Sequence, residues 1–248
     1  MPEATPLLTA TAATVWAYGV GVRRLWSRSG RGRVVHPWQV AVFATGIVIL
    51  VLTTVGPLDH AAHERLWPHM VQHLLLVSVV APLVVLGNPL VAMVSILPAR
   101  AGRQASWWRR LSRSHNRPAG WAAWAATALL VSTVALWAWH APAAYEAALE
   151  SWWLHGLQHL TFLGTALFFW WAVIGVRRRS LYGPGVLFVF VAAVQGTLLG
   201  AVMALASRPW YPAYGHVTGG GLTPMEDQQV AVRRVPRAAG QGHDGSQQ

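Results

Sequence analysis

The sequence contains no cysteine and no lysine, and charged side chains are scarce along its 248 residues. The absence of cysteine excludes disulfides, thiolate metal sites and cysteine nucleophiles. Only 11% of the residues are charged, whereas about 25% is usual in a soluble domain. With 54% hydrophobic residues and 15 tryptophans, this composition predicts an integral membrane protein.

All 19 basic residues are therefore arginine, and the sequence pI is near 11.6. Such a charge could indicate nucleic-acid binding, but the arginines are confined to a few short loops. The tendency of membrane proteins to keep basic loops in the cytoplasm explains this distribution. We therefore predict the lipid bilayer as a partner, and no nucleic acid.

Six apolar segments are long enough to cross a bilayer, which takes roughly 20 residues each. They cover residues 5–22, 37–58, 68–97, 119–140, 152–176 and 184–206. The third contains Pro82 and the Gly87-Asn88-Pro89 break, so it is either kinked or a span followed by a turn at the membrane surface. No cleavable signal peptide is apparent, so the first segment is interpreted as a retained span.

The predicted fold class is all-α, a polytopic transmembrane helical bundle of six spans. Residues 1–229 form its single domain, and residues 230–248 form a disordered tail rich in arginine and glycine. The loops after the first, third and fifth segments hold 14 of the 19 arginines and no acid, whereas the alternate loops hold six of the eight acids. The positive-inside rule then places the N-terminus outside.

Two histidine pairs, His69/His73 and His155/His159, stand near the starts of two apolar segments, and His140 ends another. Residues four apart share one face of a helix, with side chains about 5–6 Å apart, so one metal ion could bridge either pair. Neutral imidazole binds Zn, Cu, Fe and Ni. Ionisable groups at membrane depth are costly, which makes each of these histidines a candidate for function.

Plainer interpretations exist for each feature. Either pair could be interfacial histidines bonded to backbone carbonyls or water, although the doubling of the pair on one membrane face favours a metal site. The lack of a His-Glu-x-x-His motif argues against a zinc protease.

Met70 and Met203 are weaker candidates, as soft ligands for Cu(I), because methionine is also a common packing residue. Residues 143–149 predict a short amphipathic helix at the interface, and residues 59–64 predict a solvated loop.

Several motifs, considered together, carry a family resemblance. They are His69-Met-Val-Gln-His73, Ala81-Pro-Leu followed by Gly87-Asn-Pro89, Trp139-His-Ala-Pro142, His155-x-x-x-His159, Phe168-Phe-Trp-Trp171, Tyr211-Pro-x-Tyr214 and Gly221-Leu-x-Pro-x-Glu-Asp-Gln-Gln229. From about residue 23 to 231, the chain resembles the CtaG family of multi-span factors that help to assemble caa-type cytochrome c oxidase. This family differs from the single-span copper chaperone of the same name.

The resemblance implies a multi-pass protein of the bacterial plasma membrane that helps the oxidase acquire its metal centres, copper in particular. It implies that the five histidines named above handle the metal, with Asp227 in the Asp-Gln motif as a weaker candidate. In the family this motif opens a final apolar span. Here it runs into an arginine-rich tail, so the seventh span is lost or altered.

The function predicted from the sequence is therefore that of an assembly factor, not an enzyme. It binds or relays copper at the outer membrane face, with cytochrome c oxidase subunits as its partners. Two alternatives stay open at this point. One is a b-type haem protein for electron transfer, in which two imidazoles ligate the iron. The other is a metal-ion permease, although no polar path to the cytoplasmic face is evident.

Overall fold

The computed structural model describes residues 4–97, 117–175, 181–206, 208, 210–211 and 224–233. Within these residues the secondary structure is helical throughout, which confirms the predicted all-α class. The helices are α1 (Ala4–Ser29), α2 (Pro37–Val55), α3 (Pro57–Glu64), α4 (Leu66–Leu75), the π-helical turn η1 (Leu76–Val80), α5 (Ala81–Leu86), α6 (Pro89–Val94), α9 (Pro118–His140), α10 (Pro142–Glu150), α11 (Trp152–Ile174), α12 (Tyr182–Ala204) and α13 (Pro224–Arg233).

Five helical stretches in the described part of the chain are long and apolar enough to cross a membrane. They are α2, the continuous run Leu66–Leu86 formed by α4, η1 and α5, and the helices α9, α11 and α12. The first predicted span, residues 5–22, lies within α1, a single helix of 26 residues. Threonines and arginines lower the hydropathy of α1, and it is not among the five. The structure thus supports five apolar spans, and the sixth stays a prediction.

Of the two arrangements predicted for the over-long third segment, the structure shows a span followed by a turn. A π-helical turn, η1, immediately precedes Ala81 and Pro82. Proline lacks an N–H and crowds the carbonyl of the preceding turn, and a π-turn is one way to relieve that conflict within a continuous helix. The span ends at Leu86, the backbone turns through Asn88 with a left-handed φ of 55°, and the short helix α6 follows.

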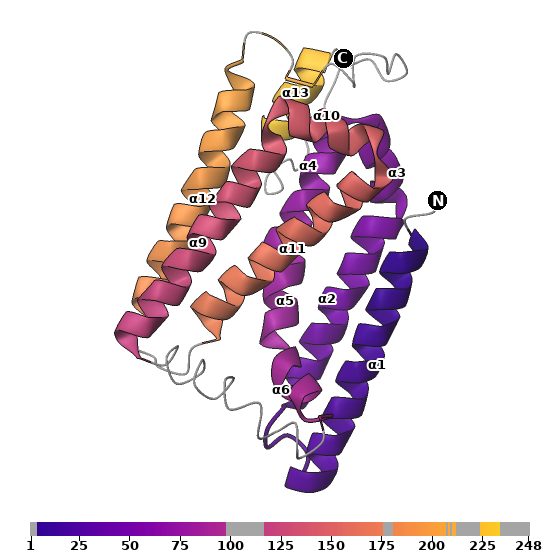
Figure 1. The fold of residues 1–248 in the computed structure, drawn as a ribbon, viewed down its shortest axis with the longest axis vertical. Helices are drawn as coiled ribbons and strands as arrows, with labels where there is room; N and C mark the ends of the chain where they lie inside the picture. Colours follow the sequence, from indigo (N-terminus) through magenta and orange to yellow (C-terminus); the bar gives the residue numbers. More distant parts are fainter. Residues whose placement is uncertain are drawn as a thin grey trace, which may run out of the picture.

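The long helices pack into one elongated bundle (Figure 1). Helices α9 and α12 lie side by side along one edge, α1 and α2 lie along the other, and α11 runs between them. Helix α11 packs against α9 on one side and against η1 and α5 on the other, so it joins the two halves of the bundle. The short helices α3, α10 and α13 gather at one end, and α6 lies at the other.

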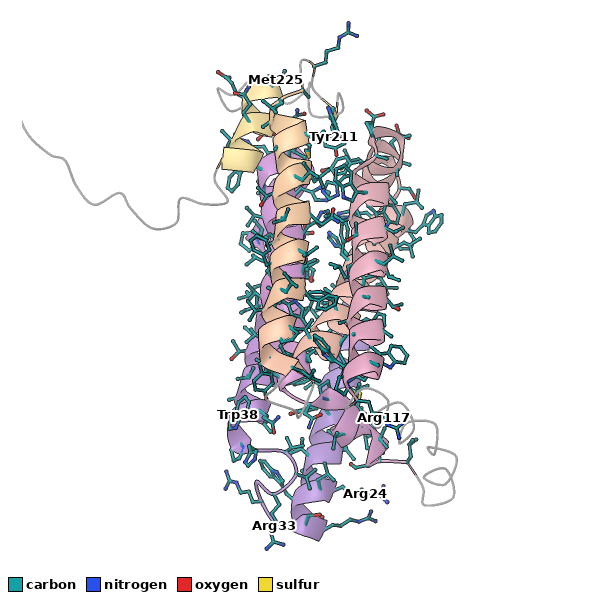
Figure 2. The ribbon with its side chains drawn as sticks, turned by 90° about the vertical axis from the view of Figure 1, so that its left-hand side faces the viewer. Arg24, Arg33, Trp38, Arg117, Tyr211 and Met225 are labelled. Atoms are coloured by element: carbon teal, nitrogen blue, oxygen red, sulfur yellow. The ribbon has the colours of Figure 1, made fainter. Side chains whose placement is uncertain are left out.

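The two ends of the bundle differ in chemistry. Arg24, Arg33 and Arg117 lie at one end, and Tyr211 and Met225 lie at the opposite end (Figure 2). We call the latter the histidine end, because the histidine pairs lie beside Tyr211, as described below. The arginine end agrees with the charge pattern of the sequence. Which end faces the cytoplasm stays a prediction of the positive-inside rule.

Two local predictions need correction, and one is confirmed. Residues 59–64 are not a loop, because they belong to helix α3, which starts with Pro57 in its first turn, where proline suits a helix. Helix α13 continues to Arg233, so the first four residues of the predicted tail are helical, and residues 234–248 lie outside the described residues. The predicted short helix at residues 143–149 is α10.

Candidate metal centre

The first turns of α4 and α11 carry the two histidine pairs. Each helix begins after one extended residue, Arg65 or Ser151, which changes the chain direction at the histidine end. Because the pairs are spaced by four, each lies on one helix face, and that face is turned inward. His69, His73 and His155 are buried, and His159 is half-buried.

The structure brings the two pairs into contact with each other. The ring centroids of His69 and His155 are 5.2 Å apart, and those of His73 and His159 are 5.1 Å apart. Within the pairs, the centroids are 4.4 Å apart for His69 and His73, and 4.3 Å apart for His155 and His159. Four imidazoles from two spans therefore form one compact group, which we call the four-histidine cluster.

Three of these residues can present one nitrogen each to a common point. The ligand nitrogens of His69, His155 and His159 all lie within 4.8 Å of one another. Ligands about 2.0–2.1 Å from a tetrahedral ion are about 3.3 Å apart, so small side-chain movements would complete such a site. The Nε2 atoms of His69 and His73 are already 3.0 Å apart, which makes His73 a fitting fourth ligand.

His140, the fifth predicted ligand, lies beside the cluster but outside the group of three. Its Nδ1 donates to the carbonyl oxygen of Leu136 at 2.8 Å, one turn earlier in α9. This bond leaves the lone pair on Nε2, the state in which histidine binds metals. Its ring centroid is 6.2 Å from that of His73. His140 could therefore bind an ion held by the cluster after a side-chain movement, or bind the ion after it leaves the cluster.

Two tyrosines complete the surroundings of the cluster, and the sequence patterns did not assign them a role. Tyr145 on α10 is fully buried, and its Oη is 3.1 Å from Nδ1 of His69. Its ring stacks on that of Tyr211 at a centroid distance of 3.9 Å. The Tyr211 hydroxyl donates to the carbonyl oxygen of His140 at 2.9 Å. Sequence spacing alone could not show that Tyr145 reaches a histidine of another helix.

Each histidine pair also contains a fully buried glutamine, and the two differ in their bonds. The amide nitrogen of Gln72 donates to the carbonyl oxygen of Thr53 at 2.8 Å and to Oδ1 of Asp59 at 3.0 Å. Asp59 is therefore a buried structural acid rather than part of a solvated loop. Neither amide atom of Gln158 has a hydrogen-bond partner among the described residues. A buried polar group in this state needs a water or a ligand atom to satisfy it.

The weaker candidates Met70, Met203 and Asp227 lie close to the cluster but have other contacts. Met70 and Met203 pack into an apolar core with Tyr145 and Tyr211. Oδ2 of Asp227 accepts a hydrogen bond from the backbone N–H of Leu66 at 2.9 Å. The carboxylate thereby caps the first turn of α4, immediately before His69, and Asp227 is not part of the convergent group formed by His69, His155 and His159.

We expect Asp227→Ala to lower stability while leaving the metal stoichiometry unchanged. Loss of a helix-capping side chain costs about 0.5–2 kcal/mol, and here it also removes a hydrogen bond between α13 and α4. Thermal unfolding in detergent and metal content per chain measure the two effects. Asp227→Asn keeps an acceptor oxygen for the Leu66 amide and should recover most of the stability. A loss of metal in both variants, with unfolding unchanged, would show instead that the carboxylate is a ligand.

A family model described as cytochrome c oxidase caa3 assembly factor matches residues 16–233. The chain belongs to this family. The match contains all five histidines, both tyrosines and Asp227, and it confirms the family predicted from the sequence motifs. No curated protein and no solved structure gives a significant match.

Membership in the caa3 assembly factor family assigns the chain a part in assembling cytochrome c oxidase. It also indicates where to look for that activity. The matched region ends with α13, the helix whose Asp227 caps α4, so all the residues of the four-histidine cluster lie within it. The five apolar spans agree with a multi-pass membrane protein.

Proposed function

We propose that this assembly factor binds copper at the four-histidine cluster and passes it on to a cytochrome c oxidase subunit. The observation that carries the proposal is the convergence of the ligand nitrogens of His69, His155 and His159 within 4.8 Å. In a chain of an oxidase assembly family, such a group suits a metal that the oxidase requires. The protein on this proposal holds and releases an ion and turns over no substrate.

The donor set supports copper. Imidazole nitrogen suits copper in both common oxidation states, and among divalent first-row metals copper binds such sites most strongly. The chain offers no thiolate, and no carboxylate belongs to the convergent group. A site made of neutral ligands holds its ion less tightly than a thiolate site, which agrees with a role in delivery.

The contacts of two of the histidines, His69 and His140, support a metal-binding role. A histidine that binds a metal through one nitrogen almost always donates the other N–H to an acceptor. Nδ1 of His140 bonds to a backbone carbonyl, and Nδ1 of His69 meets the Tyr145 hydroxyl. The bond of His140 leaves the lone pair on its Nε2, and a ligand role for Nε2 of His69 requires the tyrosine oxygen to accept from Nδ1–H.

Two other functions considered from the sequence are less well supported. Haem ligation would need a porphyrin between two imidazoles, but the histidine rings of the cluster pack directly against one another at centroid distances of 4.3–5.2 Å. A permease would need polar groups beyond the cluster, yet the buried side chains that follow along α4–α5 and α11 are apolar. They are Leu76, Val80, Ala81, Phe162, Ala166, Phe169, Ala172 and Val173. A Soret band or ion flux in liposomes would favour these alternatives.

The copper content of the purified protein tests the proposal. We expect about one copper per chain in detergent-purified wild type, and none in the double variant His73→Ala/His159→Ala. His60→Ala is the matched control, because it removes a histidine whose side chain is 72% exposed on α3. Equal copper in the wild type and the double variant would place the metal elsewhere. No copper in a folded wild type would contradict direct copper binding.

A further inference from the structure

The segment around the first histidine pair recurs 86 residues later in the chain. Residues 61–74 and 147–160 are identical at eight of fourteen aligned positions. The shared residues are two adjacent alanines, a glutamate, a tryptophan, the two histidines of the pair, the glutamine between them and the leucine that follows. The repeat therefore includes more than the ligands, since it begins in the short helix that precedes each pair.

The structure repeats with the same offset. Helix α3 ends at Glu64 and α10 at Glu150, and after one extended residue α4 begins at Leu66 and α11 at Trp152. The same backbone bond closes each short helix, from residue 65 to residue 61 at 3.0 Å and from residue 151 to residue 147 at 3.1 Å. Each short helix follows a long one, α2 or α9. The chain thus contains two units of span, short helix and span.

The histidine cluster lies where these two units meet. The two intrapair distances, 4.4 and 4.3 Å, are nearly equal, as a two-fold relation between the units requires. Equivalent rings lie close together across the units, with centroids 5.2 Å apart for the first histidines and 5.1 Å apart for the second. The two units are joined through the packing of α11 against η1 and α5. An ion bound by both pairs would lie near this approximate axis.

The repeat shows where the two units differ. The position of Asp59 in the first unit is held by Tyr145 in the second. The Asp59 carboxylate bonds to Gln72 of its own unit, whereas the Tyr145 hydroxyl reaches His69 of the other unit. Tyr145 therefore makes a contact across the approximate axis. It joins the short helix α10 of the second unit to His69 on α4 of the first unit.

We propose that Tyr145 is a positioning residue that prepares His69 for metal binding, an inference that rests on the proposed function. Nε2 of His69 is 3.0 Å from Nε2 of His73 and faces the convergent group, so it is the nitrogen that a metal would use. The proton of His69 must then sit on Nδ1, 3.1 Å from the Tyr145 oxygen, which can accept it. With its hydroxyl in the acceptor role, Tyr145 directs the Nε2 lone pair at the convergent group and fixes the plane of the ring.

Several features of the surroundings support this assignment. Tyr145 is fully buried and its ring stacks on that of Tyr211. The Tyr211 hydroxyl is bonded to the backbone of His140, so the stacked ring restricts the movement of Tyr145. A rigid tyrosine orients its partner better than a mobile one, because less movement is left to lose on binding.

The test compares Tyr145→Phe with Tyr211→Phe in the full-length protein. Both variants remove one buried hydroxyl and keep the ring, but the Tyr211 hydroxyl bonds to a backbone carbonyl rather than an imidazole. Cu(I) affinity is measured by competition with a chromophoric chelator. We expect about 10–100-fold weaker binding in Tyr145→Phe, the usual effect of losing an outer-shell partner, and little change in Tyr211→Phe.

A spectroscopic readout separates positioning from a general loss of structure. Imidazole ¹⁵N NMR of the Cu(I)-loaded protein reports which nitrogen of His69 carries the proton, and Tyr145→Phe should broaden or shift the Nδ1–H signal alone. Unchanged affinity and an unchanged signal in Tyr145→Phe would overturn the inference. Equal losses in the two tyrosine variants would also overturn it. Failure of the wild type to bind Cu(I) would instead overturn the proposed function on which it rests.

Discussion

Replacing His155 with alanine is expected to weaken copper binding by at least 100-fold and to leave the oxidase without copper in cells whose only copy is the variant. His155 is one of the three residues whose ligand nitrogens converge within 4.8 Å. Its loss leaves at most two members of that group, and a buried cavity in place of the ring. Copper content per chain and cytochrome c oxidase activity in membranes measure the two consequences.

A graded set of variants makes this result specific. His140→Ala should weaken binding less than His155→Ala, because His140 lies outside the convergent group and contacts the cluster through His73. His60→Ala should bind copper as the wild type does, because its side chain is exposed on α3. An equal loss in His140→Ala and His155→Ala would move the proposed site towards α9, and full binding in His155→Ala would refute it.

Gly21→Ala is expected to separate α1 from the rest of the bundle. A β-carbon at Gly21 would overlap the carbonyl oxygen of Ala92 in α6, a backbone atom that cannot turn away. The same contact includes a hydrogen bond from the Ser95 hydroxyl to the carbonyl oxygen of Gly21 at 3.1 Å. Overpacking of this kind costs about 1–3 kcal/mol, and more where backbone must move. Thermal unfolding in detergent should show a loss of several degrees.

Gly19→Ala provides the matched comparison on the same helix. No heavy atom lies within 4 Å of the β-carbon position at Gly19, so the added methyl group meets no obstacle. Alanine is favoured over glycine in a helix by about 1 kcal/mol, so this variant should be as stable as the wild type or more so. If both glycine variants lost the same stability, the contact with α6 would not be the cause of the loss in Gly21→Ala, because Gly19 makes no such contact.

The spans and the histidine pairs could be predicted from the sequence because both depend on local patterns. An apolar run of about 20 residues satisfies its backbone hydrogen bonds only as a helix when it crosses a bilayer. A spacing of four places two side chains on one helix face regardless of what surrounds the helix. Helix α1 has a helical pattern but a low hydropathy, and the structure does not place it among the apolar spans. Residues 59–64 are polar, which predicted a loop, but they form part of the short helix α3.

The tertiary structure decided what the histidines contact. No local pattern states that α4 and α11 turn their histidine faces towards each other, because that depends on how α11 packs between α9 and α5. The same holds for Tyr145, which is 76 residues from His69, and for Asp227, which caps α4 from a distance of 161 residues.

The sequence by itself therefore determined the family, the helical membrane-spanning architecture and the residues that could bind a metal. The tertiary structure alone decided that the two pairs form one cluster, that His140 stands beside it, and which side chains hold it in place. The physical reason is that helix formation and membrane crossing depend on residues near in sequence. A metal site of several helices depends instead on packing between segments, in which the partners of each imidazole come from distant parts of the chain.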